Sequence, residues 1–114
     1  MNAARPLHER HCTHGPAALD DAAIGALLPQ LDGWRVDGNR LVREFLFRDY
    51  HETIEFVNAL AFMVHREDHH PDLQVGYRRC TASWTTHSAG HKLSENDFIC
   101  AARADAIYAG RAGA

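Results

Sequence analysis

Two adjacent histidines stand directly before a proline in the stretch His69-His70-Pro71. Neighbouring side chains on a helix diverge by about 100°, so two successive imidazoles inside a helix could not reach one target. Pro71 disfavours helical backbone at His70 and favours an extended conformation there. A helix that ends at His69 therefore allows both rings to reach one cavity. Imidazole titrates near neutral pH, so the pair suits proton transfer. The simpler interpretation is a pair of solvated histidines at a helix end.

Two further residues are candidates for the same site. His87 follows a strand pattern over residues 78–86, and continued alternation would place it on the same side as Ser83. Asp97 stands three residues after Ser94, at the expected start of the last helix. Asp97 can serve there as the acid of a capping box, or it can join the three histidines. We interpret His69, His70, His87 and Asp97 as one site.

Metal binding is a competing interpretation of the histidines. Zinc proteases use two histidines four residues apart, but the order His65-Arg66-Glu67-Asp68-His69 lacks their glutamate in its required place. A second group near the N-terminus has no distant ligand pair at the spacing typical of zinc sites; it comprises His8, His11, Cys12 and His14. We therefore expect no metal, and we interpret residues 1–16 as a flexible N-terminal arm.

The elements that must position these residues follow from capping residues and from apolar spacing. The expected elements are a helix over 20–28, strands over 34–36 and 40–47, a helix over 50–67, strands over 73–76 and 78–86, and a helix that Ser94 caps. The order α-β-β-α-β-β-α predicts a single α+β domain over residues 17–114, with a four-stranded antiparallel sheet and three helices on one face. One buried face of the first two strands is predicted from Trp34, Val36, Phe45 and Phe47.

Bulk properties exclude several classes of protein. The chain has 114 residues, 46% of them hydrophobic, and a net charge of −3, which suits one folded domain without a nucleic-acid-binding surface. No apolar run approaches the roughly 20 residues of a membrane span, and the N-terminus lacks the apolar core of a signal peptide. Three cysteines without paired spacing are interpreted as reduced thiols, so we expect a cytoplasmic protein.

Three segments carry a resemblance to a known family: Asp68-His69-His70-Pro71-Asp72-Leu73, Thr86-His87-Ser88, and Leu93-Ser94-Glu95-Asn96-Asp97-Phe98. Together they resemble the signature of the pterin-4a-carbinolamine dehydratases, and the resemblance extends over about residues 17–108. It implies a three-helix, four-stranded α+β fold. It also implies a 4a-hydroxytetrahydrobiopterin dehydratase, which forms quinonoid dihydropterin and water in tetrahydrobiopterin recycling, without metal or cofactor.

The resemblance also implies roles for individual residues. His69 and His87 would be the acid/base pair, and His70 would bind and orient the pterin substrate. Asp97 would fix the tautomer of an imidazole, above all that of His87. The other expected pterin contacts are Pro71, Thr86 and Ser88.

Two departures from the family pattern concern His65, where many relatives have glutamate, and the loop before Asp97, which is one residue longer at His91-Lys92. Two other functions stay open: a regulatory dimerisation protein that binds pterin, and a role in molybdopterin metabolism. The wide apolar stripe over residues 50–67 and an expected free sheet edge predict a homodimer or homotetramer.

Overall fold

The computed structural model describes residues 5–111. Its elements are α1 (Asp21–Leu27), β1 (Arg35–Asp37), β2 (Arg40–Leu46), α2 (Tyr50–Glu67), β3 (Asp72–Val75), β4 (Arg79–Trp84) and α3 (Glu95–Ala109). Short 3-10 turns lie at Leu7–Glu9, Leu28–Gln30 and His87–Ala89. The predicted order α-β-β-α-β-β-α is confirmed, and the ends of the predicted elements agree to within two residues.

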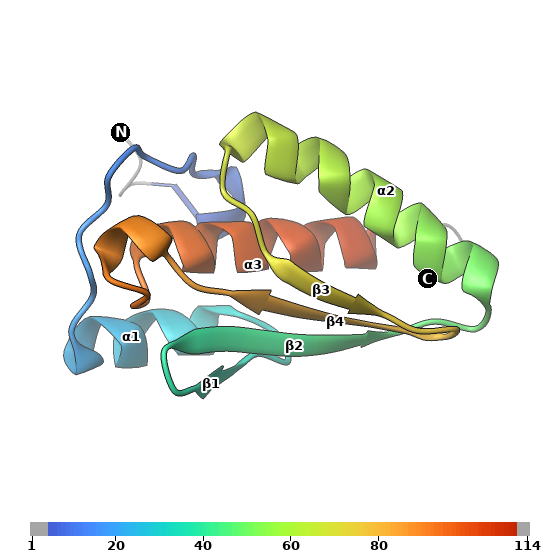
Figure 1. Cartoon of the computed structure of the whole chain (residues 1–114), viewed down its shortest axis with the longest axis horizontal. Coiled ribbons are helices and arrows are strands. Elements are labelled where there is room, and N and C mark those ends of the chain that lie inside the picture. Colours follow the sequence, from blue (N-terminus) through green and yellow to red (C-terminus); the bar gives the residue numbers. More distant parts are fainter. Residues whose placement is uncertain (1–4, 112–114) are drawn as a thin grey trace.

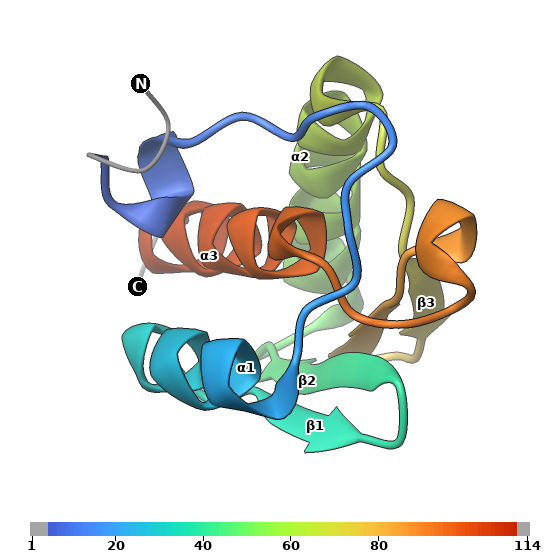
Figure 2. The same ribbon diagram turned by 90° about the vertical axis from the view of Figure 1, so that its left-hand side faces the viewer.

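The four strands form one antiparallel sheet in the order β1-β2-β4-β3, with the helices on one side of it (Figures 1 and 2). The predicted α+β class is therefore confirmed. In the pairing of β3 with β4, Asp72 lies opposite Ser83 and Leu73 opposite Ala82. Because the strands are antiparallel, the residues just before β3 lie beside those just after β4. This register brings the end of α2 close to residues 85–88.

Side-chain caps begin the three helices where the sequence predicts them. Asp20 accepts a hydrogen bond from the Ala23 amide, and Asp49 accepts one from the Glu52 amide. Ser94 and Asp97 form a complete capping box at the start of α3. Each such cap typically stabilises a helix by about 1 kcal/mol.

The core lies between the sheet and helices α2 and α3. Phe45, Trp84 and Phe98 are fully buried, and burial of one such side chain typically contributes about 1.5–3 kcal/mol. Trp34 and Phe47 are buried as predicted, but Val36 is 37% exposed. Val36 lies on β1, an edge strand of three residues, so little structure covers it.

Residues 5–16 pack against the domain, which differs from the flexible arm that the sequence predicts (Figure 2). Leu7 is 3% exposed and belongs to the core. The carbonyl of Arg10 accepts a hydrogen bond of 2.9 Å from Nε of Arg103, and the Cys12 amide donates one of 2.8 Å to Oε1 of Glu67. Most of these partners belong to α3, which lies more than 80 residues away in sequence.

The cysteines differ in accessibility, which makes thiol reactivity a test of the packing. Burial raises the pKa of Cys80 to about 11, from an ordinary value of 9.0. The contact with Cys12 and burial both raise the pKa of Cys100. Since the thiolate is the nucleophile, we expect iodoacetamide at neutral pH to alkylate half-buried Cys12 first. Peptide mass mapping of the folded protein checks this, and preferential labelling of Cys80 would contradict the packing.

Within residues 5–111, no helix is long and apolar enough to cross a membrane.

Candidate functional site

The end of α2 places His69 and His70 on either side of a sharp change in backbone direction. Asp68 has φ 52° and ψ 43°, a left-handed conformation that ends the helix, and its amide donates to the carbonyl of Val64. This conformation is uncommon outside glycine, although aspartate tolerates it better than most residues. Pro71 follows and leads into β3. The two adjacent imidazoles thus lie in a turn rather than in a helix, and both border the same cavity.

Asp97 lies at the centre of a buried hydrogen-bond network. Its side chain is fully buried, and its Oδ1 is 2.6 Å from Nε2 of His69. Its Oδ2 accepts hydrogen bonds from the Thr86 hydroxyl at 2.8 Å and from the Ser94 amide at 2.9 Å. Three donors around one carboxyl group match a carboxylate that only accepts. The acid of the capping box is therefore also the partner of a candidate catalytic histidine.

Neighbouring hydroxyl groups complete this network in one direction. The Thr86 hydroxyl donates to Asp97, so its oxygen can accept from the Ser94 hydroxyl, which lies 2.7 Å away. Ser94 in turn accepts from the Asn96 amide at 3.2 Å. Each buried hydroxyl therefore has both a donor and an acceptor, and Asp97 is held rigidly at the start of α3.

The His69 ring is fixed in both plane and tautomer. It stacks on Trp84 with a centroid separation of 5.5 Å and an interplanar angle of 14°. Nε2 carries the proton that it donates to the Asp97 carboxylate, which leaves Nδ1 to exchange a proton with a ligand. Among the described residues, the buried indole N–H of Trp84 has no hydrogen-bond acceptor.

A cavity of about 470 Å³ adjoins this pair. Its walls come from segments that are distant in the sequence: residues 13–16, 68–70, 85–88 and Asn96. A volume of this size suits a small polar ring system. Of the residues predicted from the sequence, those that line the cavity are His69, His70, Thr86, His87 and Ser88. Asp97 lies behind His69, and Pro71 is not part of the lining.

His87 lies at the opposite side of the cavity, in a position that the strand alternation predicts wrongly. β4 ends at Trp84, and His87 begins the 3-10 turn His87–Ala89, so the two-residue period stops before it. Its exposed ring packs edge-on against His91, with centroids 4.5 Å apart. The expectation that Asp97 orients His87 is also wrong, because the carboxylate bonds to His69.

The longer loop before α3 closes on itself. His91 has φ 60°, and its amide donates to the carbonyl of Thr86, while the Thr86 amide donates to the carbonyl of Lys92. Thr86 therefore keeps its place despite the additional residue, and its side chain still reaches Asp97. His65 is exposed on α2 and is not part of the cavity lining. Among residues 5–111, no three His, Cys, Asp or Glu side chains group to hold a metal ion.

The part of the site that the sequence analysis missed comes from the N-terminal arm. Residues 13–16 form one wall of the cavity, with His14 among them, and Asn96 forms another part of the lining. His14 enters the sequence analysis only as a possible metal ligand. No spacing in the sequence could reveal this wall, since the contacts that place it run from the arm to residues more than 50 positions away.

Glu67 anchors the arm, and its ionisation gives a testable pH dependence. Burial alone would raise the pKa of Glu67, but the Cys12 amide, the His11 ring and the Arg103 charge together lower it below 4.5. The folded-state pKa is thus below the unfolded-state value. Glu67 therefore contributes stability above about pH 4.5, and that contribution is lost as pH falls through the folded-state pKa.

The variant Glu67→Gln isolates this contribution because glutamine does not titrate. We expect the melting temperature of the wild type to exceed that of Glu67→Gln near pH 6, and the difference to shrink toward about pH 3. Scanning calorimetry of both proteins over this range measures it. A difference that stays constant with pH would show that the charge of Glu67 does not hold the arm.

The fold and the site together define a small α+β protein whose cavity is lined by four imidazoles, one of them bonded to a buried carboxylate. Residues 17–107 match the family model described as Pterin 4 alpha carbinolamine dehydratase. The chain belongs to this family.

Individual relatives agree with this assignment. A protein of Nitrosospira multiformis named "Putative pterin-4-alpha-carbinolamine dehydratase" is 48% identical over 97 residues, which cover 85% of each chain. A protein of Bdellovibrio bacteriovorus with the same name is 52% identical over 93 residues, covering 79% of this chain and 78% of the relative.

Two solved structures resemble the fold. A transcriptional coactivator/pterin dehydratase from Brucella melitensis superposes with a TM-score of 0.76 and 31% identity, over 80% of this chain and 98% of that one. A pterin dehydratase-like protein identified as a RuBisCO assembly factor in the alpha-carboxysome superposes with a TM-score of 0.61 and 26% identity, over 70% and 94% of the two chains. The family fold therefore occurs in proteins described by different roles.

Proposed function

We propose that this protein is a 4a-hydroxytetrahydrobiopterin dehydratase that acts through histidine acid/base catalysis. The observation that carries the proposal is the bond between His69 and the buried Asp97 at the edge of a cavity that His87 borders from another side. The family assignment supports a pterin as the ligand. The proposed catalytic residues are His69, His70, His87 and Asp97.

The proposed reaction needs two proton transfers. One group protonates the leaving hydroxyl, the bond between C4a and that oxygen breaks, and water departs. The lone pair of the adjacent ring nitrogen forms the new C=N bond, and a second group removes the proton from that nitrogen. A cationic imidazole and a neutral imidazole can perform the two steps near neutral pH, each contributing on the order of 10²–10⁴-fold. No electron transfer occurs, so the step needs no redox cofactor.

The two histidines divide this work from different sides of the cavity. Nδ1 of His69 exchanges the proton, because Nε2 is committed to Asp97. The carboxylate stabilises the positive charge that the His69 ring gains on protonation, as in other acid–imidazole pairs. His87 serves the other transfer. His70, exposed and next to His69, binds and orients the pterin, with Pro71, Thr86 and Ser88 as further proposed contacts.

The direct test is the rate at which the purified protein converts 4a-hydroxytetrahydrobiopterin to quinonoid dihydropterin, followed by absorbance. We expect a rate well above the spontaneous dehydration in buffer, unaffected by addition of a chelator. No acceleration at micromolar enzyme would refute the proposal. Comparison with a pterin that carries the molybdopterin side chain distinguishes the biopterin role from the alternative in molybdopterin metabolism.

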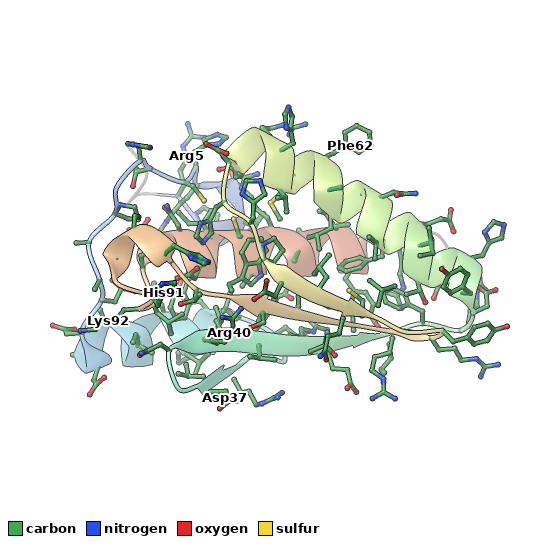
Figure 3. The ribbon with its side chains drawn as sticks, viewed as in Figure 1. Arg5, Asp37, Arg40, Phe62, His91 and Lys92 are labelled. Carbon is green, nitrogen blue, oxygen red and sulfur yellow. The ribbon has the colours of Figure 1, made fainter. Side chains whose placement is uncertain are left out.

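A binding or assembly role is the second candidate function. Exposed apolar side chains favour it: Phe62 on α2 is 75% exposed and projects away from the domain, and Leu46 is 58% exposed (Figure 3). β3 is also an edge strand, with Val75 at 43% exposure. Exposed large apolar groups and free strand edges are features that oligomers cover.

We therefore expect a homodimer or homotetramer at micromolar concentration. The replacement Phe62→Glu places a charge on the exposed face of α2 and should shift the assembly toward smaller species if α2 forms an interface. Light scattering coupled to size-exclusion chromatography measures both proteins. A monomeric wild type would contradict the prediction.

A further inference from the structure

We propose that the N-terminal arm forms a built wall of the substrate site and that His14 is a substrate-binding residue. This inference rests on the proposed function and extends it to a segment outside the stretch that matches the family model, residues 17–107. It requires that the arm be held in place, that His14 face the cavity, and that its ring be available to a ligand.

The side chain of Asn96 holds the arm directly before His14. Its Oδ1 accepts a hydrogen bond from the Thr13 amide at 3.0 Å, and its Nδ2 donates to the Thr13 carbonyl at 2.8 Å. Asn96 is 4% exposed, so both bonds are shielded from water. The amide side chain thus satisfies both polar groups of one arm residue, in the way that a neighbouring strand would.

Two further bonds limit the movement of the arm on either side of this point. Before it, the Cys12 amide donates to Glu67 at 2.8 Å. After it, the Leu19 amide donates to the carbonyl of Leu93 at 2.8 Å. In Figure 2 the arm passes from the end of α2, across the start of α3, to α1. The short segment between these anchors therefore lies across the site with little freedom.

His14 lies in this segment and has no other function there. It lines the same cavity as His69 and His87 and is exposed. Among residues 5–111 its ring makes no hydrogen bond. Gly15, which follows, has φ +62°, a conformation that turns the chain at this point and favours glycine. An imidazole held at a cavity wall without a protein partner can hydrogen-bond the amide-like ring edge of a pterin.

A double-mutant cycle on His14 and Asn96 tests the inference. His14→Ala should raise KM for 4a-hydroxytetrahydrobiopterin about threefold to tenfold, the worth of one ligand hydrogen bond, and leave kcat within about twofold. Asn96→Ala should raise KM at least as much, because it releases Thr13. If Asn96 acts through His14, the double variant should bind no worse than Asn96→Ala. The variant His14→Gln, which keeps a donor, should recover part of the loss.

His8→Ala is the matched control, since His8 is an exposed histidine of the same arm that does not line this cavity. It should behave as the wild type. Calorimetric titration with 7,8-dihydrobiopterin gives the same comparison as dissociation constants, independent of turnover. An active wild type with unchanged KM and affinity in His14→Ala would overturn this inference alone. A wild type that neither binds this pterin nor accelerates dehydration would overturn the proposed function as well.

Discussion

Removal of both His69 and His87 should reduce the dehydration rate far more than removal of either one. Each imidazole supplies one proton transfer, typically worth on the order of 10²–10⁴-fold, and water or the remaining imidazole can replace one of them in part. The double variant has no positioned donor, so we expect its rate to lie at least about tenfold below the slower single variant. The larger single loss should be that of His69→Ala, because only this ring is oriented by a buried carboxylate.

The measurement is kcat and kcat/KM for His69→Ala, His87→Ala and the double variant, with folding checked by circular dichroism. His51→Ala is a suitable control, since His51 is an exposed histidine in the first turn of α2 and lies outside the cavity. A His87→Ala protein that matches the wild type, alone and in the His69→Ala background, would remove His87 from the catalytic site. His69 would then perform both transfers or share them with solvent.

Replacement of Asp97 by asparagine should lower kcat by at least about 10²-fold, because the comparable change in a serine protease costs about 10⁴-fold through the wrong tautomer. An asparagine side chain offers one acceptor oxygen where three donors converge. Its NH₂ group must then face at least one donor, from His69, Thr86 or Ser94. Leaving a buried group unsatisfied also costs about 1–3 kcal/mol of stability.

Asp105→Asn separates the catalytic loss from the structural one. Asp105 is a half-buried acid on the same helix, and it accepts hydrogen bonds from Nε1 of Trp34 and from Arg43. This variant should lose stability and keep its kcat, whereas Asp97→Asn should lose both. Equal kcat values for the wild type and Asp97→Asn, measured at saturating substrate on folded protein, would show that Asp97 serves only as a cap.

The fold could be predicted from the sequence because its signals are local. Asp20, Asp49 and Ser94 mark the starts of the helices through hydrogen bonds that span three residues or fewer, and β4 shows its buried face through the alternation of Cys80, Ala82 and Trp84. Val36 departs from its pattern because the edge strand β1 has too little cover.

The site was predictable only in part, because its bonds are not local. The residue types at positions 69, 70, 87 and 97 indicate proton-transfer chemistry, but their pairing depends on where β4 stops. The strand ends at Trp84, so His87 turns away and His69 becomes the partner of Asp97. The wall formed by the arm depends on bonds from the Asn96 side chain to main-chain atoms of Thr13. Main-chain groups are the same in every residue, so no pattern of residue types announces them.

The bridge between Thr13 and Asn96 also has a consequence for the order of events during synthesis. The two residues are 83 positions apart, which at about 5–20 residues per second means roughly 4–17 s of translation. During that time the arm has emerged from the ribosome but α3, which holds most of its partners, has not. Contacts this distant in sequence form late and slowly. The cavity is thus closed by the first segment made and the last helix made, and a nascent chain cannot hold its substrate until translation has passed α3.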